Sequence, residues 1–196
     1  MRFNKNYSEF GNRQKMNDRL TYDPRLLKLN AEHALATLEK FYFDNRKASR
    51  LISGIAVSSR LPNANDTSFL AKGVDFTLPT PLLWNHQWER PLGRVISVER
   101  RGDALHFKAE IGNNMFWIDQ IWAEVIARNA AAVSVGGESL LDPVCNRTFS
   151  YWRLNEISVV QVGADPGAVI DRCWERLPYV TLNRPNETQH WSAQCG

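Results

Sequence analysis

Short apolar segments separated by polar turns recur along the chain from Leu51 onward. Alternating and β-branched apolar residues in segments of this length predict β-strands. The pair Gly102-Asp103 lies between two such segments and predicts a hairpin turn, and residues 62–67 predict a loop. The predicted strand segments are residues 51–59, 82–86, 92–98, 104–111, 131–135 and 149–162.

The segment before these strands has the three- and four-residue spacing of an amphipathic helix. It begins at Asp23-Pro24, an N-cap residue followed by proline at the first helical position, and it fades near Asp44. Two interpretations of its apolar face stay open, namely packing on its own domain or docking on another protein. That face consists of Leu27, Ala31, Ala34, Leu35, Leu38, Phe41 and Tyr42.

Two further helices are expected between the strand segments. The longer one covers about residues 114–129, where Asp119 and Arg128 can face water. A shorter helix is expected after Asp165-Pro166-Gly167, and it ends at about Arg176. The apolar face of the longer helix consists of Met115, Ile118, Trp122, Val125 and Ile126.

Many short strands with few helices favour an α+β fold, built as a small β-barrel or closed sheet. At 196 residues the chain is long enough for one substantial core. Residues 1–22 and the tail from Pro178 are polar and are expected to be poorly ordered. We therefore predict a polar segment with a helical extension over 1–49, one domain over 50–177 and a polar tail over 178–196.

The charge and the cysteines narrow the classes of function. The formal net charge is only +3, and basic residues occur in short pairs such as Arg100-Arg101, so no nucleic-acid-binding surface is predicted. No apolar run approaches the length of a membrane span. The cysteines Cys145, Cys173 and Cys195 form no close pair, which is typical of a reducing compartment, and no zinc-ligand spacing occurs. The chain is therefore predicted to be cytosolic, without a metal or a cofactor.

Three polar residues stand in otherwise apolar, strand-like segments. They are His86 in residues 81–88, Ser134 in residues 131–137 and Glu156 in residues 154–160. A serine nucleophile needs a neighbouring base, and that base needs an orienting carboxylate, so these residue types are the parts of an acyl-transfer site. Their order along the chain is no objection, because such triads are defined by geometry.

Each of the three also has a structural interpretation. Ser134 is either a nucleophile or a small residue tolerated in a sheet; Gly136-Gly137 after it would let a substrate backbone approach. The backbone N–H groups of Val135 and Gly136 are the candidate oxyanion donors. His86 at a strand end suits a base, although single histidines are more often structural.

The partner of Glu156 also stays open at this stage. A carboxylate in an apolar strand needs a specific partner, and Arg94 or Arg153 could serve as well as a histidine. Ser158 lies two residues further on the same strand face, where it could join the same hydrogen-bond network. The other histidines, His33, His106 and His190, lie on a helix, in mid-strand and in the tail, and are weaker candidates for a base.

The order and contexts of these segments resemble the prohead proteases of tailed bacteriophages, a family structurally related to the herpesvirus capsid-maturation protease, assemblin. The family pattern has a histidine ahead of a Pro-x-Gly turn, a Ser-x-Gly strand and a Glu-x-Ser-x-Val strand. That last strand ends in a segment of small residues and proline. The matching segments here run from His86 to Gly93, from Ser134 to Gly136 and from Glu156 to Ala168. The resemblance covers about residues 51–170.

The resemblance implies an assemblin-like β-barrel with peripheral helices, and a serine endopeptidase that cleaves scaffold protein inside the procapsid in the host cytoplasm. Ser134 would be the nucleophile, His86 the base and then the acid, and Glu156 the orienting third member. Scaffold protein and major capsid protein would be the substrates, with the scaffold as a separate chain or as the delta region of a capsid protein. Self-association is a further expectation.

Two departures from the family pattern keep other functions open. Family members often have phenylalanine after the Ser-x-Gly strand, whereas Gly137-Glu138 stands here, and the extension before Leu51 is longer. One alternative is a non-catalytic head or scaffold component that retains the protease fold. Another is an unrelated β-barrel binding module whose buried polar residues are structural.

Overall fold

The computed structural model describes residues 24–58, 67–140, 147–177 and 192–193. The polar segment 1–22, the loop at 62–66 and most of the tail from Pro178 lie outside these residues, and so do Asp23 and His190. Within the described residues, no helix is long and apolar enough to cross a membrane.

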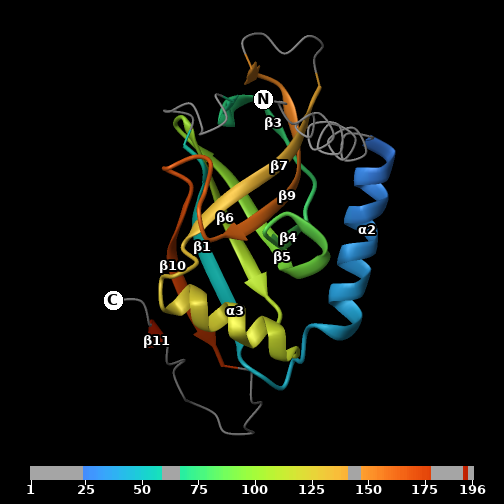
Figure 1. Cartoon of the computed structure of the whole chain (residues 1–196), viewed down its shortest axis with the longest axis vertical. Helices are drawn as coiled ribbons and strands as arrows, with labels where there is room; N and C mark the ends of the chain where they lie inside the picture. The colour runs from blue at the N-terminus through green and yellow to red at the C-terminus, as the bar shows by residue number, and fades with distance from the viewer. Residues whose placement is uncertain (1–23, 59–66, 141–146, 178–191, 194–196) are drawn as a thin grey trace, which may run out of the picture.

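Seven strands form a closed ring in the order β1-β6-β5-β4-β9-β7-β10, and β10 pairs back with β1 (Figure 1). Neighbours in the ring are antiparallel except β4 and β9, which run parallel. The predicted α+β barrel with peripheral helices is confirmed. The ring strands are β1 (Ser49–Val57), β4 (Thr80–Trp84), β5 (Gln87–Arg101), β6 (Ala104–Ile111), β7 (Ala132–Ser139), β9 (Trp152–Val160) and β10 (Val169–Arg176).

Smaller elements lie at the ends and edges of the ring. The two-residue strands β2 (Ser68–Phe69) and β8 (Thr148–Phe149) pair with each other, beside a 3-10 turn at Ala71–Gly73. Strand β3 (Val74–Asp75) lies along β9, and β11 (Ser192–Ala193) lies along β10. The predicted hairpin turn at Gly102 joins β5 to β6, and Gly102 there has a φ of +59°.

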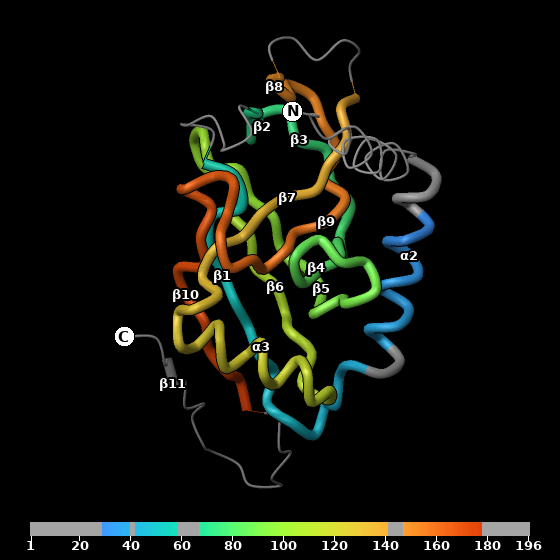
Figure 2. Tube along the Cα trace, viewed as in Figure 1, coloured from blue at the N-terminus to red at the C-terminus, as the bar shows by residue number. Residues whose placement is uncertain are grey.

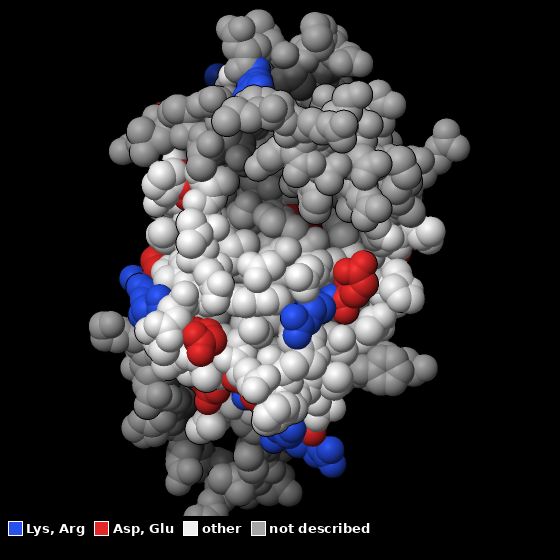
Figure 3. Space-filling view, in the orientation of Figure 1, with Lys and Arg blue, Asp and Glu red and all other residues white. Residues whose placement is uncertain are grey.

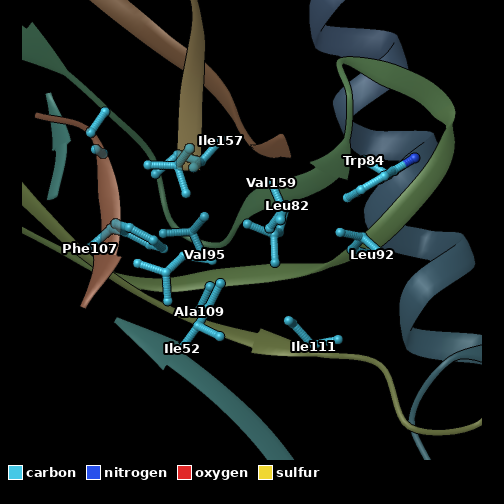
Figure 4. Close-up of a cluster of buried hydrophobic side chains, with 14 of the residues drawn as sticks. Ile52, Leu82, Trp84, Leu92, Val95, Phe107, Ala109, Ile111, Ile157 and Val159 are labelled. Atoms are coloured by element: carbon cyan, nitrogen blue, oxygen red, sulfur yellow. The ribbon is translucent and has the colours of Figure 1, made fainter. Parts of the chain in front are cut away.

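The interior of the ring is filled by apolar side chains (Figure 4). On β6 every second residue from Leu105 to Ile111 is buried, while the residues between them are partly exposed. Full burial of one large aliphatic or aromatic side chain contributes about 1.5–3 kcal/mol. The alternation on β6 places the core inside the ring and polar side chains on its outer face, whereas β4 is buried along its whole length.

Helix α2 (Pro24–Phe41) runs along the outside of the ring next to β4 and β5 (Figures 1 and 2). Its residues Ala34 and Leu38 are buried in the core, so the interpretation of a helix packed on its own domain is confirmed. Asn113, at the end of β6, accepts a hydrogen bond from the Asp44 N–H and donates to the Ala48 carbonyl. The buried Asn113 side chain thus fixes the connection from α2 to β1.

Helix α3 (Phe116–Ile126) crosses one end of the ring (Figure 2). Ile118, Trp122 and Val125 are buried, as the apolar spacing predicts. The sequence pattern places Ile126 on the same face, and this prediction is wrong, because Ile126 is 42% exposed at the end of the helix.

The helix expected between Gly167 and Arg176 does not form, and this segment is strand β10. It pairs with β1 over nearly its whole length, from Val169 beside Ile55 to Arg176 beside Ser49. Without β10, the backbone groups along one edge of β1 would be unpaired. The pairing that closes the ring outweighs a weak local helical pattern. This pairing is a long-range contact, so the local sequence does not predict it.

Cys173 lies buried on β10 and is disulfide-bonded. The prediction of reduced cysteines is therefore wrong for this residue. Spacing along the sequence does not report which cysteines a fold brings within bonding distance.

Candidate active site

His86 is presented by a two-residue turn between β4 and β5. Trp84 pairs with Gln87, which leaves Asn85 and His86 at the tip, with φ angles of +49° and +59°. Two successive left-handed residues are typical of a type I′ hairpin turn, in which asparagine is favoured and the second position usually holds glycine. A histidine in this conformation is uncommon and costs about 1 kcal/mol or more.

Glu156 and Ser158 reach the outer face of the ring through a β-bulge in β9. Gly136 of β7 pairs with Glu156 but Gly137 pairs with Leu154, so Asn155 is the extra residue. Leu154 faces the core before the bulge, and after it Glu156 and Ser158 share the opposite face. The bulge thus removes the carboxylate from the apolar interior.

Two hydrogen bonds join His86 to β9, and a third, within β9, links their two acceptors. His86 Nδ1 lies 2.7 Å from Glu156 Oε1, and Ser158 Oγ donates to Glu156 Oε2 at 2.7 Å. The backbone N–H of His86 donates to Ser158 Oγ at 2.9 Å. Glu156 is 3% exposed, whereas the His86 side chain is 47% exposed. Both oxygens of a buried carboxylate are therefore bonded, and the ring above them remains accessible.

The arginines that could have paired with Glu156 have other partners. Arg94 bonds to Glu110 at 2.8 Å, and Arg153 bonds to Asp75 at 3.2 Å. Glu156 is therefore bonded to the histidine rather than to either arginine.

Ser134 lies directly opposite Ser158 in the β7–β9 pairing. Residues opposite each other in an antiparallel pair project to the same face, so Ser134 shares the face of Glu156 and Ser158. Among the described residues its hydroxyl has no hydrogen-bond partner, and no hydrogen bond joins it to the His86 ring. Since Ser158 Oγ already donates and accepts, Ser134 carries the available hydroxyl of the two.

Two neighbouring glycines have a task that the sequence pattern does not predict. A Cβ atom at Gly136 would collide with the Glu156 carboxylate, and one at Gly137 would collide with Arg153 and Trp152. The glycines make room for groups of the protein itself, and their expected approach to a substrate backbone stays a prediction. No local sequence pattern predicts the contact of Gly136 with Glu156, because the two residues are 20 positions apart and lie on different strands.

The two candidate oxyanion donors point to different sides of β7. The Val133 N–H donates to the Ala168 carbonyl, on the side away from β9. N–H groups point to alternate edges of a strand. The Val135 N–H therefore points to the same edge as that of Val133, away from β9, and the Gly136 N–H points to β9. Strand β10 pairs with β7 only at Ala132, so no ring strand covers the edge at Val135. Of the two candidates, only Val135 has its N–H on the edge of β7 that no ring strand pairs with there.

The charge of Glu156 sets the protonation of the His86 ring. Partial burial acts to lower the pKa of His86, but the hydrogen bond and the negative charge of Glu156 outweigh it, so the pKa lies above its ordinary value. A carboxylate accepts hydrogen bonds only, so Nδ1 carries the proton and Nε2 is the free basic nitrogen in the neutral ring.

The other described histidines lack such surroundings. His33 is exposed on α2. His106 lines an open cleft of about 340 Å³ on the outer face of β1, β5, β6 and β10, together with Lys108 and Asp171. No cluster of three potential ligands for a metal occurs among the described residues. On the face drawn in Figure 3, the described acidic and basic side chains are scattered.

Comparison with known proteins finds a relative by sequence. No protein-family model matches the chain. The capsid polyprotein of Pseudomonas phage PAJU2 is 25% identical to it over 152 residues. The chain is a relative of a phage capsid polyprotein. The match covers 72% of this chain and 22% of the polyprotein, so the chain spans less than a quarter of its relative's length.

Two viral proteases are among the solved structures with a similar fold. The KSHV protease in complex with a hexapeptide phosphonate inhibitor has a TM-score of 0.43 at 10% identity, over 65% of this chain and 64% of that chain. The varicella-zoster virus protease has a TM-score of 0.39 at 14% identity, over 64% of each chain. The overlap is partial, and the closed ring described above rests on its own strand pairing.

Proposed function

We propose that the chain is a serine endopeptidase that cleaves scaffold or capsid protein segments inside a phage procapsid during head maturation. The observation that carries this proposal is the bond of 2.7 Å between His86 Nδ1 and the buried Glu156 carboxylate, on the same face as the free Ser134 hydroxyl. The relationship to a capsid polyprotein supports an association with capsid components and a location in the procapsid within the host cytoplasm.

The proposed reaction uses these three residues. Ser134 Oγ attacks the peptide carbonyl carbon, and His86 Nε2 takes the hydroxyl proton. Glu156 holds Nδ1–H and stabilises the imidazolium that forms. His86 then gives the proton to the leaving amine, and a water molecule hydrolyses the acyl-enzyme with the same base. General base catalysis of this kind contributes roughly 10²- to 10⁴-fold, and no metal or cofactor is needed.

The negative charge on the carbonyl oxygen needs a donor during attack. The Val135 N–H, which immediately follows the nucleophile, is the proposed donor, and Gly136 is the weaker candidate because its N–H points to β9. One such donor contributes about 2.7–4 kcal/mol to the stability of the transition state.

A second candidate function is a non-catalytic head component that retains this fold. One observation favours it, namely that no hydrogen bond joins Ser134 Oγ to the His86 ring among the described residues. Catalytic hydrogen bonds are often long before substrate binds and tighten in the complex, so the same observation is compatible with an enzyme.

The deciding experiment is co-expression of the full chain with the head proteins of its own phage, followed by mass spectrometry of the assembled particles. Wild type should cleave scaffold or capsid protein, and Ser134→Ala should leave it uncleaved while folding normally. Ser139→Ala, at the other end of β7, is the matched control and should cleave as wild type does. Cleavage by Ser134→Ala, or intact head proteins in assembled wild-type particles, would overturn the proposal and favour the non-catalytic role.

A further inference from the structure

We propose that Ser158 is a positioning residue of this site, whose hydroxyl holds both the Glu156 carboxylate and the His86 turn in place for Ser134. This inference rests on the proposed function. Ser158 is not a second nucleophile, because its hydroxyl proton is directed at Glu156 and its oxygen accepts from His86.

The contacts of Ser158 form a closed circuit. Its Oγ donates to Glu156 Oε2, and the other carboxylate oxygen binds the His86 ring at Nδ1. The backbone N–H of the same histidine returns to Ser158 Oγ. The Ser158 hydroxyl thus fixes both the Glu156 carboxylate and the backbone of His86, whose ring this carboxylate orients. A rotation of the carboxylate or a shift of the turn would break two of the three bonds.

Burial makes this hydroxyl hard to replace. Ser158 is fully buried and Glu156 is 3% exposed. Water therefore has little access to Glu156 Oε2, and this oxygen and the His86 N–H would both lose their partner if the hydroxyl were removed. If the serine were on the surface, water could replace its hydroxyl as the hydrogen-bond partner, and the geometry would not change.

The turn that carries His86 depends on β9 for support. The β4–β5 pairing is irregular between Leu83 and Trp84, next to the turn, and both tip residues have positive φ angles. Two successive N–H groups of the tip bond to β9, Asn85 to the Val159 carbonyl at 3.1 Å and His86 to Ser158 Oγ at 2.9 Å. The first bond is available to any residue at position 159, but the second requires a side-chain acceptor at 158.

A positioning role and a general structural role predict different kinetics. If Ser158 acts through Glu156 and His86, its removal lowers kcat and leaves KM nearly unchanged. Its effect must also disappear once Glu156 can no longer orient the ring, since residues that act as a unit are not additive. If Ser158 only stabilised the fold, its removal would lower activity by the same factor in wild type and in Glu156→Gln.

The test compares Ser158→Ala, Glu156→Gln and the double variant with wild type, using cleavage of the head-protein substrate and the thermal unfolding midpoint. Ser158→Ala should lower kcat about tenfold or more with KM within about twofold, and the double variant should match Glu156→Gln within about twofold. Ser53→Ala is the matched control, because Ser53 Oγ also donates to a carboxylate, at 3.0 Å to Asp171, but on the far side of the ring. It should leave kcat unchanged.

Titration of the His86 ring by NMR in full-length protein gives a readout that does not depend on cleavage. Ser158→Ala should move the His86 titration midpoint, and Ser53→Ala should not. If Ser158→Ala does not fold, Ser158→Cys keeps the volume with a weaker donor, and its kcat should fall below that of wild type. Unchanged kcat and unchanged titration in the Ser158 variants would overturn the inference. Cleavage by Ser134→Ala would instead overturn the proposed function, and the titration would still test Ser158.

Discussion

Two serine–carboxylate pairs on opposite sides of the ring use the same groups in different surroundings. Ser158 donates to Glu156 on β9 at 2.7 Å, and both residues are buried. Ser53 on β1 donates to Asp171 on β10 at 3.0 Å, where water reaches the pair. A histidine is near each pair, with His86 bonded to Glu156 and His106 lining the same cleft as Asp171.

The difference shows that enclosure, rather than residue type, makes the first pair a candidate site. A hydrogen bond open to water exchanges its partners at little cost, so the Ser53 pair constrains nothing around it. In the enclosed pair each carboxylate oxygen has only protein groups to bond to, and the geometry is therefore fixed. The local dielectric is also lower there, so the charge of Glu156 acts more strongly on the His86 ring.

Replacing the two carboxylates should give the largest contrast. Glu156→Gln removes the charge that orients Nδ1–H and stabilises the imidazolium, and cleavage should fall by roughly 10²- to 10⁴-fold. Asp171→Asn makes the same change in the open pair and should leave cleavage within about twofold. Initial rates on the head-protein substrate measure both. Equal losses in the two variants would show that the enclosed pair has no special role.

Crowding the enclosed carboxylate should have the next largest effect. Gly136→Ala brings a Cβ atom into the Glu156 carboxylate, which must move away from His86 Nδ1. Displacements of about 1 Å can cost about 100-fold, so cleavage should fall roughly 10- to 100-fold while the ring remains folded. Gly102→Ala is the control, because a Cβ there meets no atom outside its own and neighbouring residues, and the strain from its φ of +59° falls on the β5–β6 turn rather than on Glu156. Activity retained by Gly136→Ala would mean that the carboxylate position is not critical.

The two serines should differ in their effect on the free energy of unfolding. Ser158→Ala leaves a buried carboxylate oxygen and the His86 N–H without their partner, which should destabilise the fold by about 1–3 kcal/mol. Ser53→Ala exposes its partner to water and should cost less than about 0.5 kcal/mol. Urea denaturation of both variants measures the difference, and equal values would contradict the assignment of enclosure as the cause.

A smaller effect is expected in the pH dependence. The pKa of His86 is raised by the Glu156 hydrogen bond and charge, and the base must be neutral to act. The acid limb of kcat/KM should therefore have its midpoint above about 6.5, the ordinary histidine value, and Glu156→Gln should lower it. His106→Asn should leave the midpoint unchanged. An acid limb at or below the ordinary value in wild type would argue against His86 as the base.

The same raised pKa predicts the direction of a change in stability. The charged His86 gains from Glu156 in the folded state, so this contribution is fully present below the pKa of the unfolded chain. It is lost as the pH rises through the higher folded pKa. The contribution is small, because the His86 side chain is 47% exposed and solvent screens the pair.

The sequence was sufficient where local pattern and final structure agree. The strands at β5 and β6 and the core face of α3 follow from spacing, because burial of alternate residues dictates both. The three site residues could be proposed because each is a polar residue in an apolar segment. The resemblance to the prohead proteases then implied a role for each of them.

Other features depend on contacts that a linear pattern does not contain. Strand β10 forms because β1 needs a partner, not because residues 169–176 have a strong strand pattern. The bulge at Asn155 changes which residues of β9 face outward, and only the pairing with Gly136 and Gly137 reveals it. The left-handed conformation of His86 departs from the usual preference for glycine, so propensity alone would not predict it.

The single parallel pair in the ring has a consequence that follows from parity. Strands that alternate in direction can close a ring only if their number is even, so a ring of seven must contain a pair that runs the same way. In this protein the odd pair is β4 and β9, and the site is built along that seam, with His86 just past the end of β4 and Glu156 on β9. With one ring strand more or one fewer, the ring could close without a parallel pair. The strand count of the barrel and the meeting of these two residues are therefore linked properties of one topology.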